Sequence, residues 1–179
     1  MVTESICTLL GHTFSLSRLA AALGQLTTHI LDHLANALQL GFINAHPTED
    51  HYQFEHPIIR EVIYTEMLSG LRKRYHHRAA RVLEQEGQPG LLDAKIDALA
   101  HHYLRAGQHE QALAYLARAV KRARTLHAFE SALNYLDQAL AVVDCLSRTA
   151  TDAEEQAQRD KQRADLLAAR TQIEALIAD

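Results

Sequence analysis

Apolar residues recur at every third or fourth position along most of the chain, which is the spacing of helices with one buried face. Polar or glycine-containing segments between these runs supply the usual signals for helix ends. The chain is therefore expected to be mainly α-helical. Helices are predicted over residues 3–10, 15–23, 28–40, 57–68, 70–86, 91–106, 109–126, 129–145 and 151–178.

The apolar period changes to two after residue 41. Residues 42–45 and 52–55 alternate in polarity and flank the turn-rich segment 46–50, a pattern that predicts a β-hairpin. Three helices followed by a hairpin are typical of a winged helix. Residues 1–68 are therefore assigned to a winged-helix-like domain.

The clearest break in the chain is Gly87-Gln88-Pro89-Gly90, so residues 69–90 are expected to form a connecting helix and a linker. Beyond the break, apolar and small residues stand at the spacing of the tetratricopeptide repeat (TPR), in which small side chains let antiparallel helices approach closely. Residues 91–179 are therefore predicted to form TPR-like helical hairpins. The residues that carry the spacing are Ile96, Leu99, Ala100 and Tyr103, then Ala112, Leu116 and Ala119.

This array departs from a regular tandem repeat. Ala132, Leu136 and Ala139 repeat the second set after only 20 residues, whereas the tetratricopeptide period is about 34. The helix over 109–126 is therefore expected to pair with both of its neighbours. The C-terminal helix is interpreted either as the first helix of a further repeat or as a partner helix left exposed.

Composition and charge agree with a helical protein and narrow its partners. The chain of 179 residues is 47% hydrophobic and 22% charged, with only 7 Gly and 3 Pro, which favours helices. A formal net charge of −4 argues against binding nucleic acid through overall charge. The chain has neither a signal-peptide pattern nor 18 consecutive apolar residues, so we expect a cytoplasmic protein without a membrane partner.

Metal and redox chemistry find little support in the sequence. Cys7 and Cys145 lie far apart in apolar contexts and are interpreted as reduced core residues. The 12 histidines are scattered over the predicted helices without cysteine partners, so no metal site is predicted.

Local basic residues do not change the conclusion on nucleic acid. The helix over 28–40, which would be the recognition helix of a winged helix, contains no Arg or Lys. The helix over 70–86 is basic, but no aromatic residues interleave with its charges to stack on bases. Its basic side chains are interpreted as a solvated or partner-facing surface; they are Arg72, Lys73, Arg74, Arg78 and Arg81.

His56 joins the predicted hairpin to the next helix. Pro57 suits a first helical turn, which places His56 at the N-cap, near the positive end of the helix, where an anion would bind. Two roles remain open for His56 at this point. It either binds a phosphate or caps the helix and fixes it to the hairpin.

Three stretches of the chain carry a family pattern. They are Leu10-Gly11 with Phe14-Ser15-Leu16, the segment FEHPIIREVIY over 54–64, and LAHHYLRAGQHEQALAYLARAV over 99–120. Together they resemble the STAND class of signal-transduction ATPases, above all its bacterial members. In that class an AAA-like nucleotide-binding core is followed by a winged-helix domain and TPR-like helices. The chain departs from the pattern at Pro57, where the class more often has a small residue.

The resemblance implies a non-catalytic regulatory and protein-interaction segment that couples nucleotide state to a helical sensor array. In the wider class a winged-helix histidine contacts the β-phosphate of ADP, and the resemblance assigns this role to His56, with Arg60 in support. It also implies an upstream domain that binds ATP or ADP, and a protein or small-molecule inducer on the helical array. The chain itself has no G-x-x-x-x-G-K-[ST] motif, so neither a cofactor nor a catalytic residue is predicted in it.

Two other functions stay open from the sequence. A TPR-like scaffold that binds a peptide would need His102, Tyr103 or Asn134 exposed in a groove. A DNA-binding winged helix would bind duplex DNA in a salt-dependent way.

Overall fold

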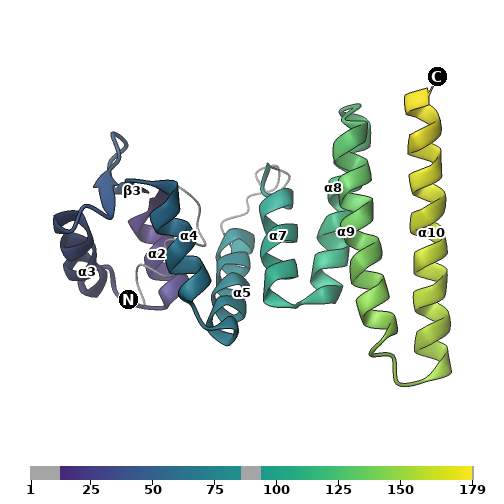
Figure 1. Ribbon diagram of the computed structural model, residues 1–179, viewed down its shortest axis with the longest axis horizontal. Helices are drawn as coiled ribbons and strands as arrows, with labels where there is room; N and C mark the ends of the chain where they lie inside the picture. Colours follow the sequence, from purple (N-terminus) through teal and green to yellow (C-terminus); the bar gives the residue numbers. More distant parts are fainter. Residues whose placement is uncertain (1–12, 86–93, 179) are drawn as a thin grey trace. The chain divides into compact units, whose positions relative to one another are not determined.

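The structure is a computed structural model that describes residues 13–85 and 94–178 (Figure 1). It is mainly helical, with one small three-stranded antiparallel sheet among the described residues. The chain divides into two compact units, Met1–Gly87 and Gln88–Asp179, called the first and second unit below. The helix expected over 3–10 and the linker expected over 87–90 lie outside the described residues.

The first unit combines the sheet with helices. The central strand of the sheet is β3, which pairs antiparallel with β1 on one side and β2 on the other. The hairpin expected from the alternating polarity is therefore present as β2 and β3. In chain order the elements are β1 (Thr13–Ser15), α2 (Leu16–Leu23), α3 (Thr27–Gln39), β2 (Ile43–Ala45), β3 (His51–Phe54), α4 (Pro57–Glu66) and α5 (Ser69–Gln85).

Local signals explain the bounds of α2. The Ser15 hydroxyl accepts a hydrogen bond from the Arg18 N–H at 3.3 Å, as an N-cap does. Gly24 ends the helix in the left-handed conformation with φ 65°, which costs glycine little. The expected apolar stripe is confirmed, because all four of its residues are buried: Leu16, Leu19, Ala20 and Leu23.

The core of the first unit lies between the sheet and the helices. Phe14 of β1 packs against Tyr52 and Phe54 of β3, with ring centroids 6.1 and 5.9 Å apart. Leu19 and Ile30, from α2 and α3, are fully buried in the same cluster. The remaining buried members are Leu16, Ala20, Ala22, Leu23, Leu34, Ala37, Ile43, Met67 and Tyr75.

The apolar residues of α4 are less buried than their spacing predicts. Ile58 and Val62 are 61% and 52% exposed, and α4 contains no buried residue. Only one side of the helix, with Ile59 and Ile63, packs against the core. The helix also ends at Glu66, two residues earlier than expected, because Met67 is extended, with φ −70° and ψ 133°.

The second unit consists of helices that follow one another closely. Each packs against the next, and α8 packs against both α7 and α9, as the offset in the repeat spacing predicts. Short connections reverse the chain direction at each step, so α8 and α10 run in the same direction (Figure 1). The helices are α7 (Ile96–Ala106), α8 (His109–Thr125), α9 (Phe129–Ser147) and α10 (Ala153–Ala178).

Small residues allow these helices to pack closely. Ala112, Ala119, Ala132 and Ala139 are each at most 2% exposed. Leu116 fills the space between Ala100 of α7 and Ala139 of α9. An alanine side chain ends at Cβ, so neighbouring helix backbones can lie near the short end of the usual range of about 8–10 Å. The residues at TPR spacing are therefore the residues that form the interior of the second unit.

Candidate functional site

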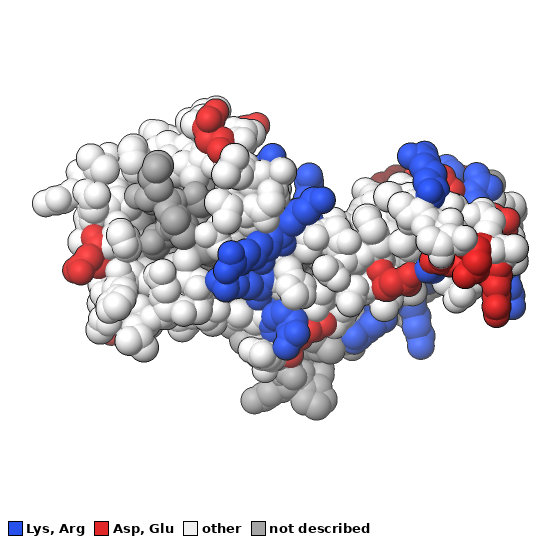
Figure 2. Space-filling view, turned by 90° about the horizontal axis from the view of Figure 1, so that it is seen from below, with Lys and Arg blue, Asp and Glu red and all other residues white. Residues whose placement is uncertain are grey.

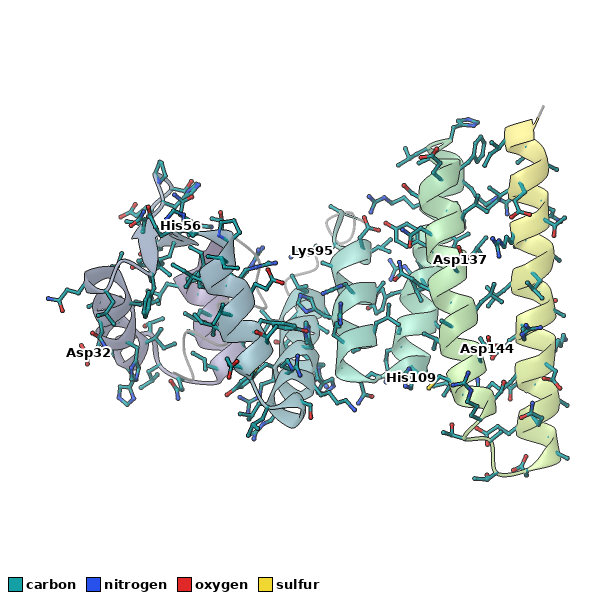
Figure 3. The ribbon with its side chains drawn as sticks, in the orientation of Figure 1. Asp32, His56, Lys95, His109, Asp137 and Asp144 are labelled. Atoms are coloured by element: carbon teal, nitrogen blue, oxygen red, sulfur yellow. The ribbon has the colours of Figure 1, made fainter. Side chains whose placement is uncertain are left out.

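His56 lies at the start of α4 and is exposed to solvent (Figure 3). Its backbone is extended, as at an N-cap, but its side chain makes no capping hydrogen bond. Arg60, one turn further along α4, is also exposed. Because Pro57 has no N–H, the first turn offers one donor fewer than an ordinary helix N-terminus. An anion at this site would therefore depend on the side chains of His56 and Arg60.

The residues expected to bind a partner, His102, Tyr103 and Asn134, do not meet in a groove. His102 and Tyr103 are 7% and 3% exposed, and Tyr103 stacks on Tyr115 with ring centroids 5.6 Å apart. Asn134 is exposed on α9 and accepts a hydrogen bond from Gln138 at 2.7 Å. The peptide-binding scaffold interpretation required one or more of these side chains to be exposed in a groove. Of the three, only Asn134 is exposed. His102 and Tyr103 instead belong to the packing of the second unit.

His102 is held in its neutral form. Burial, and to a smaller extent the neighbouring His101, lower its pKa from 6.5 to about 4. The two rings meet edge to face with centroids 5.6 Å apart. A neutral buried imidazole offers no charge to a partner at neutral pH.

Figure 2 shows a band of basic side chains on the surface, and some of the basic side chains of α5 contact other elements of the first unit. The Arg78 guanidinium donates to the Leu23 carbonyl at 2.9 Å, and Arg72 lies 5.3 Å from the centroid of the Tyr64 ring. Tyr64 in turn hydrogen-bonds the buried His76 at 3.1 Å. Some of this positive charge therefore anchors α5 to α2 and α4. Lys73, Arg74 and Arg81 are exposed.

A groove runs along the second unit between α8 and α10, with α9 at its base. It is called the α8–α10 groove below. It consists of two adjoining clefts of about 430 and 590 Å³ that share Ala117 and Val120 as lining residues. The first cleft is lined by Glu110, Leu113, Ala114, Ala117, Val120, Ala139, Val143, Gln162, Asp165 and Leu166. The second is lined by Ala117, Val120, Lys121, Arg124, Thr125, His127, Phe129 and Leu176.

A buried cation lies beside Glu110, one of the residues that line the first cleft. The Arg159 guanidinium of α10 is 2.5 Å from the Glu110 carboxylate of α8 and donates to Gln162 at 3.0 Å. Glu155 lies 3.7 Å from it. A buried charge is tolerated when it is paired and hydrogen-bonded. This ion pair therefore connects α8 to α10 at their N-terminal ends.

The opposite side of the α9–α10 seam carries ion pairs instead of a groove. Asp144 pairs with Arg163 at 3.0 Å and Asp137 with Arg170 at 3.3 Å, and both acids are labelled in Figure 3. Exposed pairs such as these add little stability, but they make this side polar. The two clefts described above therefore open on the side that α8 shares.

The groove was not predicted from the sequence, because only one buried stripe was expected on the helix that is α8. Ala114 and Ala117 are exposed and lie on a second stripe of the helix, between Glu110 and the basic pair Lys121 and Arg124. These positions are separated by four, three, four and three residues, a spacing that follows one helix face. An exposed stripe of small residues with opposite charges at its ends is the signal that could have found it.

A thiol and an imidazole also meet in the second unit. Cys145 Sγ lies 3.9 Å from His109 Nε2, and Cys145 is half-buried. A nucleophilic cysteine needs a base that a third group orients. His109 Nδ1 is buried without a hydrogen-bond partner, so no such group is in place.

The described residues contain no group of three or more His, Cys, Asp or Glu side chains placed to hold a metal ion. In the same part of the chain, no helix is both long enough and apolar enough to cross a membrane. Comparison with protein-family models, with curated proteins and with solved structures found no match. Function must therefore be inferred from the groove and from the surroundings of His56.

Proposed function

We propose that this chain is a non-catalytic regulatory and protein-interaction segment of a STAND-type signalling ATPase. The first unit would act as a winged helix that reports nucleotide state, and the second as a TPR-like array that binds a partner. The observation that carries the proposal is the α8–α10 groove. An apolar concave surface with polar groups at its ends is the common form of a binding site, and helical arrays bind partners through such surfaces.

The order of elements in the first unit supports the winged-helix assignment. Two helices follow β1, and the hairpin of β2 and β3 then returns to it, with β3 in the centre of the sheet. In a DNA-binding winged helix, α3 would enter the major groove. Its exposed side chains include Asp32 and His33 and no Arg or Lys, so α3 would meet phosphates without a fixed positive charge. This electrostatic argument favours a regulatory role over DNA binding.

The proposed mechanism is a shift between two populations. ADP on an upstream nucleotide-binding domain would contact His56 and favour a closed form, while a partner on the second unit would favour an open form. Linkage requires that the partner weaken ADP binding by the same factor by which ADP weakens partner binding. Neither step needs a catalytic group or a cofactor within this chain.

His56→Ala, made in the chain together with its upstream nucleotide-binding domain, is expected to weaken ADP binding by about 1.5–3 kcal/mol, the usual range for a hydrogen bond to a charged group. Isothermal titration calorimetry measures the change. His33→Ala removes another exposed imidazole of the first unit and is expected to leave ADP affinity unchanged. Unchanged affinity in His56→Ala, or a native chain without an upstream phosphate-binding loop, would contradict the nucleotide-sensing role.

A further inference from the structure

We infer that the α8–α10 groove binds a single α-helix of a partner protein, antiparallel to α8, with acidic side chains in its first turn and basic side chains in its last. The inference rests on the proposed protein-interaction function of the second unit. It adds the class of partner, the direction of the bound helix and the charges that it must carry.

The dimensions and lining of the groove fit one helix. From Glu110 to Arg124 the wall formed by α8 covers 15 residues, or about 21 Å for the steps between them at about 1.5 Å each. Ala114 and Ala117 line the middle of this wall and are exposed, so another helix backbone can come close there. Apolar side chains lie deeper, among them Val143 of α9 and Leu166 of α10. A matching helix therefore has about four turns and a stripe of apolar residues at intervals of three and four.

The two ends of the groove carry opposite charge. The lining of the first cleft contains the carboxylates of Glu110 and Asp165 and no Lys or Arg, and Glu110 also pairs with the buried guanidinium of Arg159. At the other end the lining contains Lys121 and Arg124 and no carboxylate. A bound helix is therefore favoured when its acidic end meets Lys121 and Arg124.

The dipoles of the two helices that flank the groove, α8 and α10, favour the same direction, whereas the dipole of α9 at its base opposes it. Because α8 and α10 run in the same direction, both present their N-termini at the acidic end of the groove. A helix antiparallel to both places its own positive N-terminus at the opposite end, beside the C-terminus of α8. Acidic residues in its first turn would then lie beside Lys121 and Arg124, and basic residues in its last turn beside Glu110 and Asp165. The charges of the lining and the dipoles of the two flanking helices therefore agree on one orientation.

The test uses two fluorescein-labelled 16-residue peptides, both blocked at their termini and held helical by the same staple on the solvent-facing side. They share a leucine stripe and a composition. One has Glu in the first turn and Lys in the last; the other has these charges exchanged. Fluorescence anisotropy with the whole chain is expected to give at least tenfold tighter binding of the first peptide.

Charge reversal in the protein tests the orientation directly. Lys121→Glu with Arg124→Glu is expected to remove or invert the tenfold preference, and Ala117→Arg is expected to abolish binding of both peptides by filling the groove. Lys161→Glu reverses an exposed charge of α10 outside the groove and is expected to leave both affinities unchanged. Circular dichroism confirms that each variant keeps its helix content.

Three results would overturn the inference. Equal binding of both peptides would mean that the groove does not select a direction. No binding of either peptide by a folded chain would mean that it does not take a helix. A homodimer dissociated by Ala117→Arg in size-exclusion chromatography with light scattering would mean that a second copy occupies the groove. None of the three affects the dependence of ADP binding on His56, so the two proposals fail separately.

Discussion

Leu116→Ala is expected to lower the free energy of unfolding of the second unit by about 3 kcal/mol, within the range of about 2–5 kcal/mol found for such substitutions in cores. Leu116 is 0% exposed and packs among Ala100, Ala139 and Val142. These neighbours are small or β-branched and come from two other helices, so they cannot easily move into the vacated space. Chemical denaturation followed by hydrogen exchange of the α7–α9 amides measures the loss.

The same substitution at Leu126 is the matched control. Leu126 follows α8 directly and is 66% exposed. Its truncation therefore removes little buried apolar surface. Its expected effect is within about 0.5 kcal/mol, as for most surface substitutions. A cost at Leu116 no larger than that at Leu126 would show that α7, α8 and α9 do not pack as the structure has them.

Helical periodicity located elements better than it located the core. In α2 all four apolar positions of the predicted stripe are buried, because α3 and α5 both pack against that helix. In α4 the same kind of stripe leaves Ile58 and Val62 exposed. Spacing establishes that two residues share a helix face, but the number of neighbouring elements decides how much of that face is covered.

The TPR spacing was informative for a different reason. Ala112, Ala119, Ala132 and Ala139 are small residues at positions where only close packing of backbones explains the absence of larger apolar side chains, and all four are buried. Ala114 and Ala117 lie in α8 with Ala112 and Ala119 and are also alanines, but they face the groove. Residue type alone could not separate the two sets, because the difference depends on where α10 lies.

The candidate partner residues show the limit of residue type as a guide to function. His102 and Tyr103 were candidates for binding a peptide on the condition that they are exposed in a groove. The structure buries both, and the stacking of Tyr103 on Tyr115 requires the position of α8. More than half of the residues that line the groove are apolar, so chemically reactive residue types could not point to it. The position of His56 could be predicted from the sequence. Pro57 indicates the first turn of α4, which places His56 at the N-cap, and the structure has an exposed His56 there.

The stability of the second unit is expected to fall as the pH is lowered below about 6.5, and His102 is the reason. Burial, and then the neighbouring His101, lower the pKa of His102 from 6.5 to about 4 in the folded chain. Between these two values the unfolded chain binds a proton at this site and the folded chain does not. Protonation therefore stabilises the unfolded state, and stability that is complete above the unfolded pKa is lost toward the folded pKa.

The size of this effect follows from the difference between the two pKa values. Each pH unit between them contributes about 1.4 kcal/mol, so the expected loss from His102 is about 2 kcal/mol between pH 7 and pH 5, and about 3 kcal/mol by pH 4. Urea denaturation of wild type and His102→Gln, compared at each pH, isolates this contribution because the other titrating groups are common to both proteins. The wild type should lose this much more stability than the variant.

His33→Gln makes the same substitution at an exposed histidine and should follow the wild-type pH dependence. An NMR titration of the His102 ring protons gives the folded pKa directly and separates it from any loss of packing caused by the substitution. If His102 titrates near 6.5 in the folded chain, or if His102→Gln retains the full pH dependence, burial does not hold this imidazole neutral. His102 would then be accessible to solvent and available to a partner, as the scaffold interpretation required.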